Sequence, residues 1–481
     1  MMSQARNMPM SGARTRSDRT FLGHPIGLFV LFLTEMWERF SFYGMRGLLK
    51  LYMVNYLFVT GRQLLQGGPI SGQGEPMAVW GWQTVQTLLP TDVQGQASVI
   101  YGWYTGLVYL TPLLGGWLAD RFWGQRKTVV VGGLLMALGH FVMAFENWFF
   151  IALILLIMGN GAFKPNISTQ VGGLYSADDP RRDGAFTIFY MGINLGAFIC
   201  NLICGTLAAI YGWHYGFAAA GVGMVLGLII YLGGQRFIAD DSLTLARQSQ
   251  LNQGSTAVPA KQKLDREEWQ RIGALVLLCT LNIVFWAVYE QQGNTMQSWA
   301  DENTVWPTIA GFTVPSTWFQ SFNPLFIFLL APFLDIFWSW QRRRNSEPSS
   351  VSKMAIGCTI VGLSFIVMLV GARIVGAGKG SIFWPVGCTF LLTIGELYLS
   401  PIGLSLVSKV APVRIVSLMM GMWFLSSFFG NTLSGYVGAL YSQISKDSFF
   451  GLLTALGLLS GAAIWALGRP IQHLMASADS K

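Results

Sequence analysis

The sequence predicts an all-α membrane protein with about twelve transmembrane helices. Of its 481 residues, 52% are hydrophobic and only 11% are charged, whereas a soluble domain usually carries about 25% charged residues. Apolar stretches long enough to cross a hydrocarbon core of about 30 Å recur along the whole chain. Together these observations indicate a polytopic membrane protein.

Six predicted spans precede the longest polar break, and six follow it. The spans are 25–57, 97–118, 127–146, 149–171, 185–210 and 214–234, then 270–291, 318–339, 353–374, 382–409, 416–441 and 447–468. The break at 235–269 is rich in Ser, Gln and Lys and indicates a cytoplasmic linker between two six-helix bundles, 21–234 and 270–469. Residues 1–20 and 470–481 are predicted cytoplasmic tails, and the first lacks the apolar core of a signal peptide.

The distribution of cations predicts the orientation. With the N-terminus in the cytoplasm, inside segments hold 23 of the 31 Lys and Arg residues and outside segments hold four. The positive-inside rule then places both termini in the cytoplasm. The expected location of the protein is the inner membrane of the cell. The net charge of +8 follows from this topology, so membrane lipid is the implied partner and nucleic acid is not. The segment 61–96, rich in Gly and Gln, is expected to be an irregular outer loop.

The first predicted span contains four charged side chains, Glu35, Glu38, Arg39 and Arg46. If they faced lipid, they would together cost on the order of 10 kcal/mol. At about 100° per residue they share one helix face with Tyr43. This face should therefore line the bundle interior or a water-filled cavity. The alternative is a buried ion-pair network that only fixes helix packing.

Motifs along the chain resemble those of one transporter family. Residues 34–46, with the sequence TEMWERFSFYGMR, resemble the E-x-x-E-R-F-x-Y-Y signature of the proton-dependent oligopeptide transporters, which belong to the major facilitator superfamily. Residues 159–166, 285–291 and 395–404 are similar to this family's fourth, seventh and tenth helices. Residues 189–196 resemble its F-Y-x-x-I-N-x-G motif, and residues 116–127 resemble the loop motif of the superfamily. The resemblance implies a major facilitator fold with a central site between its two bundles.

The resemblance implies a proton-coupled symporter that imports di- and tripeptides by alternating access, with protons as the coupling ion and no cofactor. The alternative within transport is a carrier of another zwitterionic or anionic solute, such as nitrate or a peptide-like compound. An enzyme is not expected, because the spans contain no G-x-S-x-G motif and no metal-spaced His/Glu set. A receptor-like binding protein that does not transport is a further alternative.

A zwitterionic peptide needs a cation for its carboxylate and an acceptor for its ammonium. Arg39 and Lys164 suit the carboxylate, and the resemblance implies that Asn194, Asn323 and Glu396 take the ammonium. The remaining predicted substrate contacts are Tyr43, Arg46, Tyr109, Tyr190, Trp286, Ser400 and Trp423. The aromatic members supply broad apolar walls, although helix packing explains any single one of them equally well.

Proton coupling requires an acid whose proton affinity changes with conformation, for example one that loses a cationic partner when a gate opens. The resemblance implies an outer gate of Arg46 with Glu290 and an inner gate of Lys164 with Glu396. The predicted coupling residues are Glu35, Glu38, Arg39 and Glu290.

The sequence departs from the family pattern at two positions. Phe42 replaces the first tyrosine of the Y-Y pair, and Gly102 stands where animal members carry a histidine. None of the four histidines occupies that place, so a proton relay should rest on carboxylates. The five cysteines all lie in apolar spans and are expected to be packing residues, not disulfides or metal ligands.

Overall fold

The computed structural model describes residues 20–58, 79–176, 179–238, 265–412 and 415–476. These contain twelve helices of 18 residues or more. The first six are α1 (Ile26–Tyr52), α4 (Val93–Leu118), α5 (Gln125–Val142), α6 (Phe149–Gly173), α7 (Arg182–Tyr211) and α8 (Trp213–Gly234). The other six are α10 (Arg266–Tyr289), α12 (Phe322–Arg343), α13 (Ser350–Val375), α14 (Phe383–Val410), α15 (Val416–Ala439) and α16 (Lys446–Ala476). Each coincides with one predicted span, and the predicted all-helical membrane fold is confirmed.

Shorter elements occupy the turns. The short helices are α3 (Trp82–Gln86) and α11 (Thr295–Glu302). Short 3-10 or π segments extend or join helices: η1 (Met53–Leu57), η2 (Ala119–Trp123), η3 (Glu146–Trp148), η4 (Gln235–Phe237), η5 (Glu290–Gln292), η6 (Ser316–Ser321) and η8 (Leu440–Ser442). Two-residue strands form three pairs: β1 (Thr20–Phe21) antiparallel with β2 (His24–Pro25), β3 (Thr304–Val305) parallel with β6 (Gly380–Ser381), and β4 (Thr308–Ile309) antiparallel with β5 (Phe312–Thr313).

Side-chain caps explain two boundaries that sequence reasoning misplaced. Asp92 accepts a hydrogen bond from the Gly95 amide (2.7 Å), so α4 begins inside the segment that was expected to be an irregular loop, and α3 precedes it. Residues 59–78 of that segment lie outside the described residues. Asp265 and Glu268 form a reciprocal capping box, so α10 begins four residues before the predicted C-terminal bundle. Such caps satisfy amides at a helix start that have no partner within the helix.

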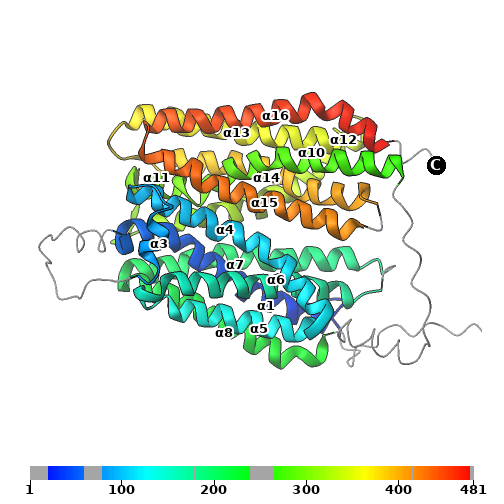
Figure 1. Ribbon diagram of the computed structural model, residues 1–481, viewed down its shortest axis with the longest axis horizontal. Coiled ribbons are helices and arrows are strands. Elements are labelled where there is room, and N and C mark those ends of the chain that lie inside the picture. The colour runs from blue at the N-terminus through cyan, green and yellow to red at the C-terminus, as the bar shows by residue number, and fades with distance from the viewer. Residues whose placement is uncertain (1–19, 59–78, 177–178, 239–264, 413–414, 477–481) are drawn as a thin grey trace, which may run out of the picture.

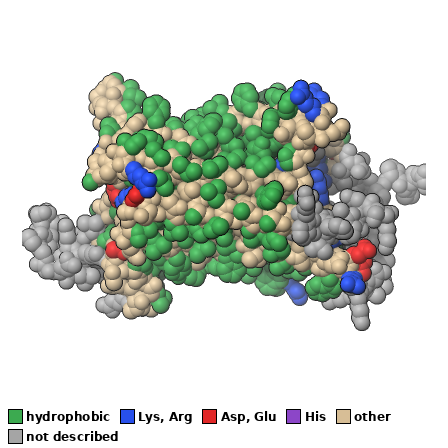
Figure 2. All heavy atoms as spheres, turned by 90° about the horizontal axis from the view of Figure 1, so that it is seen from above, with side chains coloured by type: hydrophobic (Ala, Val, Ile, Leu, Met, Phe, Trp, Pro, Cys, Tyr) green, Lys and Arg blue, Asp and Glu red, His purple; other side chains and the backbone are tan. Residues whose placement is uncertain are grey.

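Eight of the described helices are individually long and apolar enough to cross a membrane. The helix α1 is not among them, because every 18-residue window of it contains at least three charged residues. In the space-filling view, charged side chains gather toward the two ends of the molecule, and hydrophobic side chains cover the band between them (Figure 2). The molecule is a multi-pass membrane protein.

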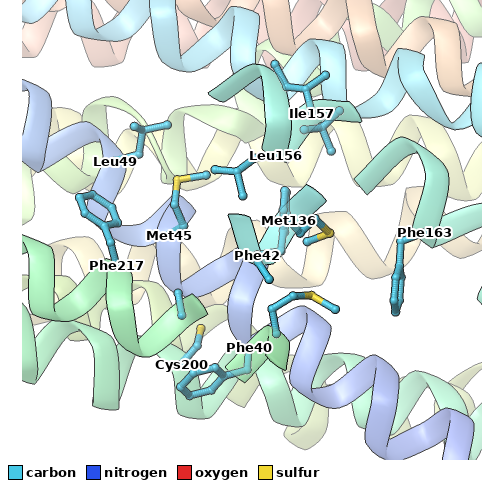
Figure 3. Close-up of a cluster of buried hydrophobic side chains, with 14 of the residues drawn as sticks. Phe40, Phe42, Met45, Leu49, Met136, Leu156, Ile157, Phe163, Cys200 and Phe217 are labelled. Atoms are coloured by element: carbon cyan, nitrogen blue, oxygen red, sulfur yellow. The ribbon is translucent and has the colours of Figure 1, made fainter. Parts of the chain in front are cut away.

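The described residues form two hydrophobic clusters, one within residues 28–238 and one within 272–464. In Figure 1 the helices of the first lie in the lower half of the picture and those of the second in the upper half, with α4 and α15 packed together between them. Figure 3 shows part of the first cluster, where Phe40 and Met45 of α1, Met136 of α5, Phe163 of α6 and Phe217 of α8 are all buried.

The helices α4 and α15 approach closely at two glycines. A Cβ atom placed on Gly102 would lie 2.6 Å from the Cα atom of Gly435, and one placed on Gly435 would lie 3.1 Å from the Cα atom of Gly102. Two backbones cannot yield as a flexible side chain can, so a larger residue here would separate the helices. A histidine at position 102 would therefore not fit between α4 and α15 in this structure.

Candidate functional site

A cavity of about 340 Å³ lies between the two halves of the molecule. Its walls come from α1, α4, α6 and α7 on one side and from α10, η5, η6, α12, α14 and α15 on the other. The volume is within the range of small-molecule sites. The predicted residues on its walls are Arg39, Tyr43, Arg46, Tyr109, Lys164, Tyr190, Asn194, Trp286, Glu290, Asn323, Glu396, Ser400 and Trp423. Glu35 and Glu38 are not among the lining residues.

Arg39 joins the two glutamates that lie on the same face of α1. Its guanidinium makes two hydrogen bonds to the Glu38 carboxylate, one of them 2.6 Å from Nη2 to Oε1, and its Nε lies 3.4 Å from Glu35 Oε1. Asn160 of α6 donates a further hydrogen bond to Glu38 (3.2 Å). All three charged side chains are at most 1% exposed, so they avoid lipid as predicted.

Glu35 is the least satisfied member of this network. Neither of its carboxylate oxygens has a hydrogen-bond partner among the described residues, and its contact with Arg39 is longer than a normal hydrogen bond. Glu35 is thus held by one ion pair, whereas Glu38 accepts hydrogen bonds from both Arg39 and Asn160.

Phe42, where the resemblance implied a tyrosine, lies against the same network. Its ring centroid lies 4.9 Å from the Arg39 Cζ atom, and that of Tyr43 lies 5.8 Å away. A guanidinium over an aromatic face gains a cation–π attraction. The missing hydroxyl of Phe42 therefore removes a possible hydrogen bond but keeps an aromatic surface against the cation.

Arg46 and Glu290 form an ion pair across the two halves. Arg46 also donates a hydrogen bond from Nε to the Tyr101 hydroxyl (2.8 Å). Glu290 is only 2% exposed and lies in η5, directly after α10. The pair expected from the sequence is thus formed, and it connects α1 to the end of α10.

Further hydrogen bonds join the halves at the same end of the bundle. They include Asn55 to Asp301 (2.9 Å), Gln94 to Glu302 (2.6 Å), Trp318 to Thr206 (3.0 Å), Ser321 to the Phe198 carbonyl (2.8 Å) and Ser442 to Asp92 (2.5 Å). These residues lie where α1, α7 and α15 approach their C-terminal ends and where α4 begins. We call this end, including the Arg46–Glu290 pair, the closed end.

Lys164 and Glu396 line the cavity from opposite halves without pairing with each other. No carboxylate of the described residues lies within ion-pair distance of Lys164, whose Nζ atom is 5.3 Å from the Tyr109 ring centroid. Glu396 accepts hydrogen bonds at Oε2 from the Tyr289 hydroxyl (2.7 Å) and from Asn323 Nδ2 (3.0 Å). The second predicted gate pair is therefore not formed in this structure, in which Glu396 is held by neutral donors.

The aromatic residues differ in how far they reach the cavity. Tyr190 is 47% exposed, whereas Trp286 and Trp423 are 7% and 3% exposed. The Trp286 indole nitrogen is buried and has no hydrogen-bond partner among the described residues.

Sequence reasoning missed several wall residues. Tyr289, Asn201, Gln292, Gln320 and Ser427 also line the cavity. Tyr289 directly precedes Glu290 within the segment 285–291. Its place beside a predicted gate residue could have marked it as a candidate wall residue. Gln320 lies in η6, outside every predicted motif, and only the fold brings it to the site.

Comparison with known proteins gives a consistent answer. The family model described as the POT family matches residues 126–243 and 237–456. The chain is 34% identical to the uncharacterized transporter YclF of Bacillus subtilis, over 95% of this chain and 96% of that protein. It is 33% identical to the di-/tripeptide transporter of Lactococcus lactis subsp. cremoris, over 96% and 98%.

A solved structure supports the same assignment. The crystal structure of the peptide transporter POT in complex with sulfate superimposes with a TM-score of 0.81, at 33% identity, over 96% of this chain and 98% of that chain. Sequence and structure thus agree over nearly the full length. The chain belongs to the POT family of peptide transporters.

Proposed function

We infer that this protein is a proton-coupled symporter that imports di- and tripeptides by alternating access. One observation carries the inference: Lys164 and Glu396 face one cavity from opposite halves, and neither has an ionic partner there among the described residues. A peptide zwitterion complements this pair, with its carboxylate toward Lys164 and its ammonium toward Glu396. The di-/tripeptide transporter of L. lactis supports this choice of substrate.

The walls fit a substrate whose ends are constant and whose side chains vary. Tyr43, Tyr109 and Tyr190 supply apolar rings with polar tips, and the cavity of about 340 Å³ leaves room for short peptides. Binding should therefore depend strongly on the two termini and weakly on the side chains between them.

The closed end suggests how alternating access proceeds. When a peptide bridges Lys164 and Glu396, it draws the two halves together at the cavity, while breaking the Arg46–Glu290 pair would release the closed end. Glu290 would then lose its cationic partner and gain proton affinity. Protonation of Glu290 or of the Glu35–Glu38 pair thus provides a way to couple proton movement to opening.

A carrier of another zwitterionic or anionic solute is the second candidate. A simple anion such as nitrate has no positive group to pair with the Glu396 carboxylate, which would therefore only repel it. The presence of Glu396 on the wall therefore favours the zwitterion.

Counterflow in proteoliposomes distinguishes these candidates. Vesicles preloaded with unlabelled alanyl-alanine and diluted into labelled alanyl-alanine should accumulate label without a proton gradient. An excess of trialanine should compete with the label, whereas nitrate and free alanine should not. Equal competition by nitrate would replace peptide import with the second candidate.

A further inference from the structure

The helix α12 has an exposed apolar face that continues into two arginine side chains. Leu329, Phe333, Ile336, Phe337 and Trp340 are 53%, 68%, 63%, 41% and 41% exposed. Their spacing of i, i+4, i+7, i+8 and i+11 places them on one stripe of the helix. Only 17% of the most apolar window of this helix is buried, the smallest share among the eight apolar spans. Acyl chains are the natural cover for such a stripe in a membrane.

Arg343 and Arg344 extend the stripe at i+14 and i+15, where α12 ends. Both side chains are exposed, and no carboxylate of the described residues lies within ion-pair distance of either one. The Arg344 Cζ atom lies 4.2 Å from the Trp340 ring centroid. The tryptophan ring therefore holds one guanidinium beside the apolar stripe, and tryptophans are enriched at membrane interfaces.

We propose that the end of α12 binds one anionic phospholipid, with its phosphodiester on Arg343 and Arg344 and an acyl chain along the stripe. A guanidinium matches the planar pair of phosphate oxygens and can bind them bidentately. The C-terminal end of a helix carries about half a negative charge, which opposes an anion, but two full positive charges outweigh it.

The neighbouring Arg342 differs in a way that makes it a control. Arg342 makes two hydrogen bonds to Glu347 (2.8 and 3.2 Å), and Lys353 pairs with the same carboxylate (2.6 Å). The hydrogen bonds from Arg342 and Lys353 lower the pKa of Glu347 to about 2, so this acid stays charged at any physiological pH. Arg342 also lies about 100° around the helix axis from Arg343, on a face that it shares with Asp335.

Native mass spectrometry of the full-length protein in detergent tests the site. Dioleoylphosphatidylglycerol and dioleoylphosphatidylcholine, which share acyl chains, are titrated against the wild type, the double variant Arg343→Gln/Arg344→Gln, and the control Arg342→Gln. We expect the wild type to bind phosphatidylglycerol more tightly than phosphatidylcholine. Affinity should fall about fivefold for each guanidinium removed from the stripe, and it should not change in Arg342→Gln.

The other outcomes overturn the proposal. Equal losses in Arg342→Gln and in the double variant would show only general attraction to positive charge. Displacement of the lipid by millimolar inorganic phosphate would assign the arginines to a free phosphate, and a shift from dimer to monomer in the double variant would make the face an interface between two copies. Thermal unfolding of each variant is measured in parallel, and the single variants Arg343→Gln and Arg344→Gln keep the test open if the double variant is unstable.

Discussion

Replacing Glu396 with Gln should weaken the binding of peptides only when they carry a free amino terminus. Glu396 Oε2 accepts hydrogen bonds from Tyr289 and Asn323, and the glutamine carbonyl oxygen can accept both. The substitution therefore keeps the local structure and removes one negative charge from the cavity wall.

The size of the effect follows from the hydrogen bond that is lost. Hydrogen bonds to charged groups contribute about 1.5–3 kcal/mol, against about 0.5–1.5 kcal/mol for neutral ones. The difference of about 1–2 kcal/mol corresponds to a Kd for alanyl-alanine that is roughly 5- to 30-fold higher. N-acetylated alanyl-alanine has no ammonium, so its Kd should change by less than about threefold on the same scale.

Equilibrium binding of the two peptides to purified protein, without a membrane potential, isolates this interaction from transport. Ser400→Ala is the comparison variant, because Ser400 lines the same cavity one turn after Glu396 but carries no charge. As a predicted substrate contact without charge, it should affect the two peptides equally. Equal weakening of both peptides by Glu396→Gln would show that Glu396 does not contact the ammonium.

Three further experiments, with five single substitutions and one double swap, test the charged residues of the transport cycle. Lys164→Ala should abolish proton-driven uptake of labelled dipeptide while the protein still folds into the membrane, and normal uptake would remove Lys164 from the mechanism. Each of Arg46→Glu and Glu290→Arg should lose exchange activity, and the double swap should recover part of it, since the pair at the closed end is ionic; no recovery, together with unchanged reactivity of single variants toward external thiol reagents, would argue against a gate. Glu35→Gln and Glu38→Gln should keep peptide exchange but lose accumulation against a gradient, because glutamine cannot titrate; if both variants still accumulate peptide, these carboxylates are structural.

The helices were predictable because membrane spans leave a strong signal in composition and length. Each of the twelve predicted spans meets one long helix, even α1, which its own charges exclude from the apolar class. The boundaries of α4 and α10 were less predictable, since they depend on the caps at Asp92 and Asp265. A cap is a local hydrogen bond, and hydropathy does not detect it.

The membership of the cavity wall was also largely predictable, because helix periodicity and family motifs both point to inward faces. The pairing of its charges was not. Arg46 meets Glu290, but Lys164 and Glu396 do not meet, since pairing depends on which end of the bundle is closed. The exposed arginines at the end of α12 entered the sequence analysis only as part of a charge count. Only the side-chain contacts distinguish them from Arg342, which pairs with Glu347.

Accumulation of dipeptide driven by a membrane potential tests the central claim most directly. Proteoliposomes containing the protein are given an inside-negative potential of about 100 mV without a pH gradient, which contributes ~2.3 kcal/mol for each proton moved. One proton per neutral zwitterion then predicts about 50-fold accumulation of labelled alanyl-alanine, and a proton-conducting uncoupler should abolish it. An internal concentration that only equals the external one, in vesicles that show counterflow, would contradict proton coupling.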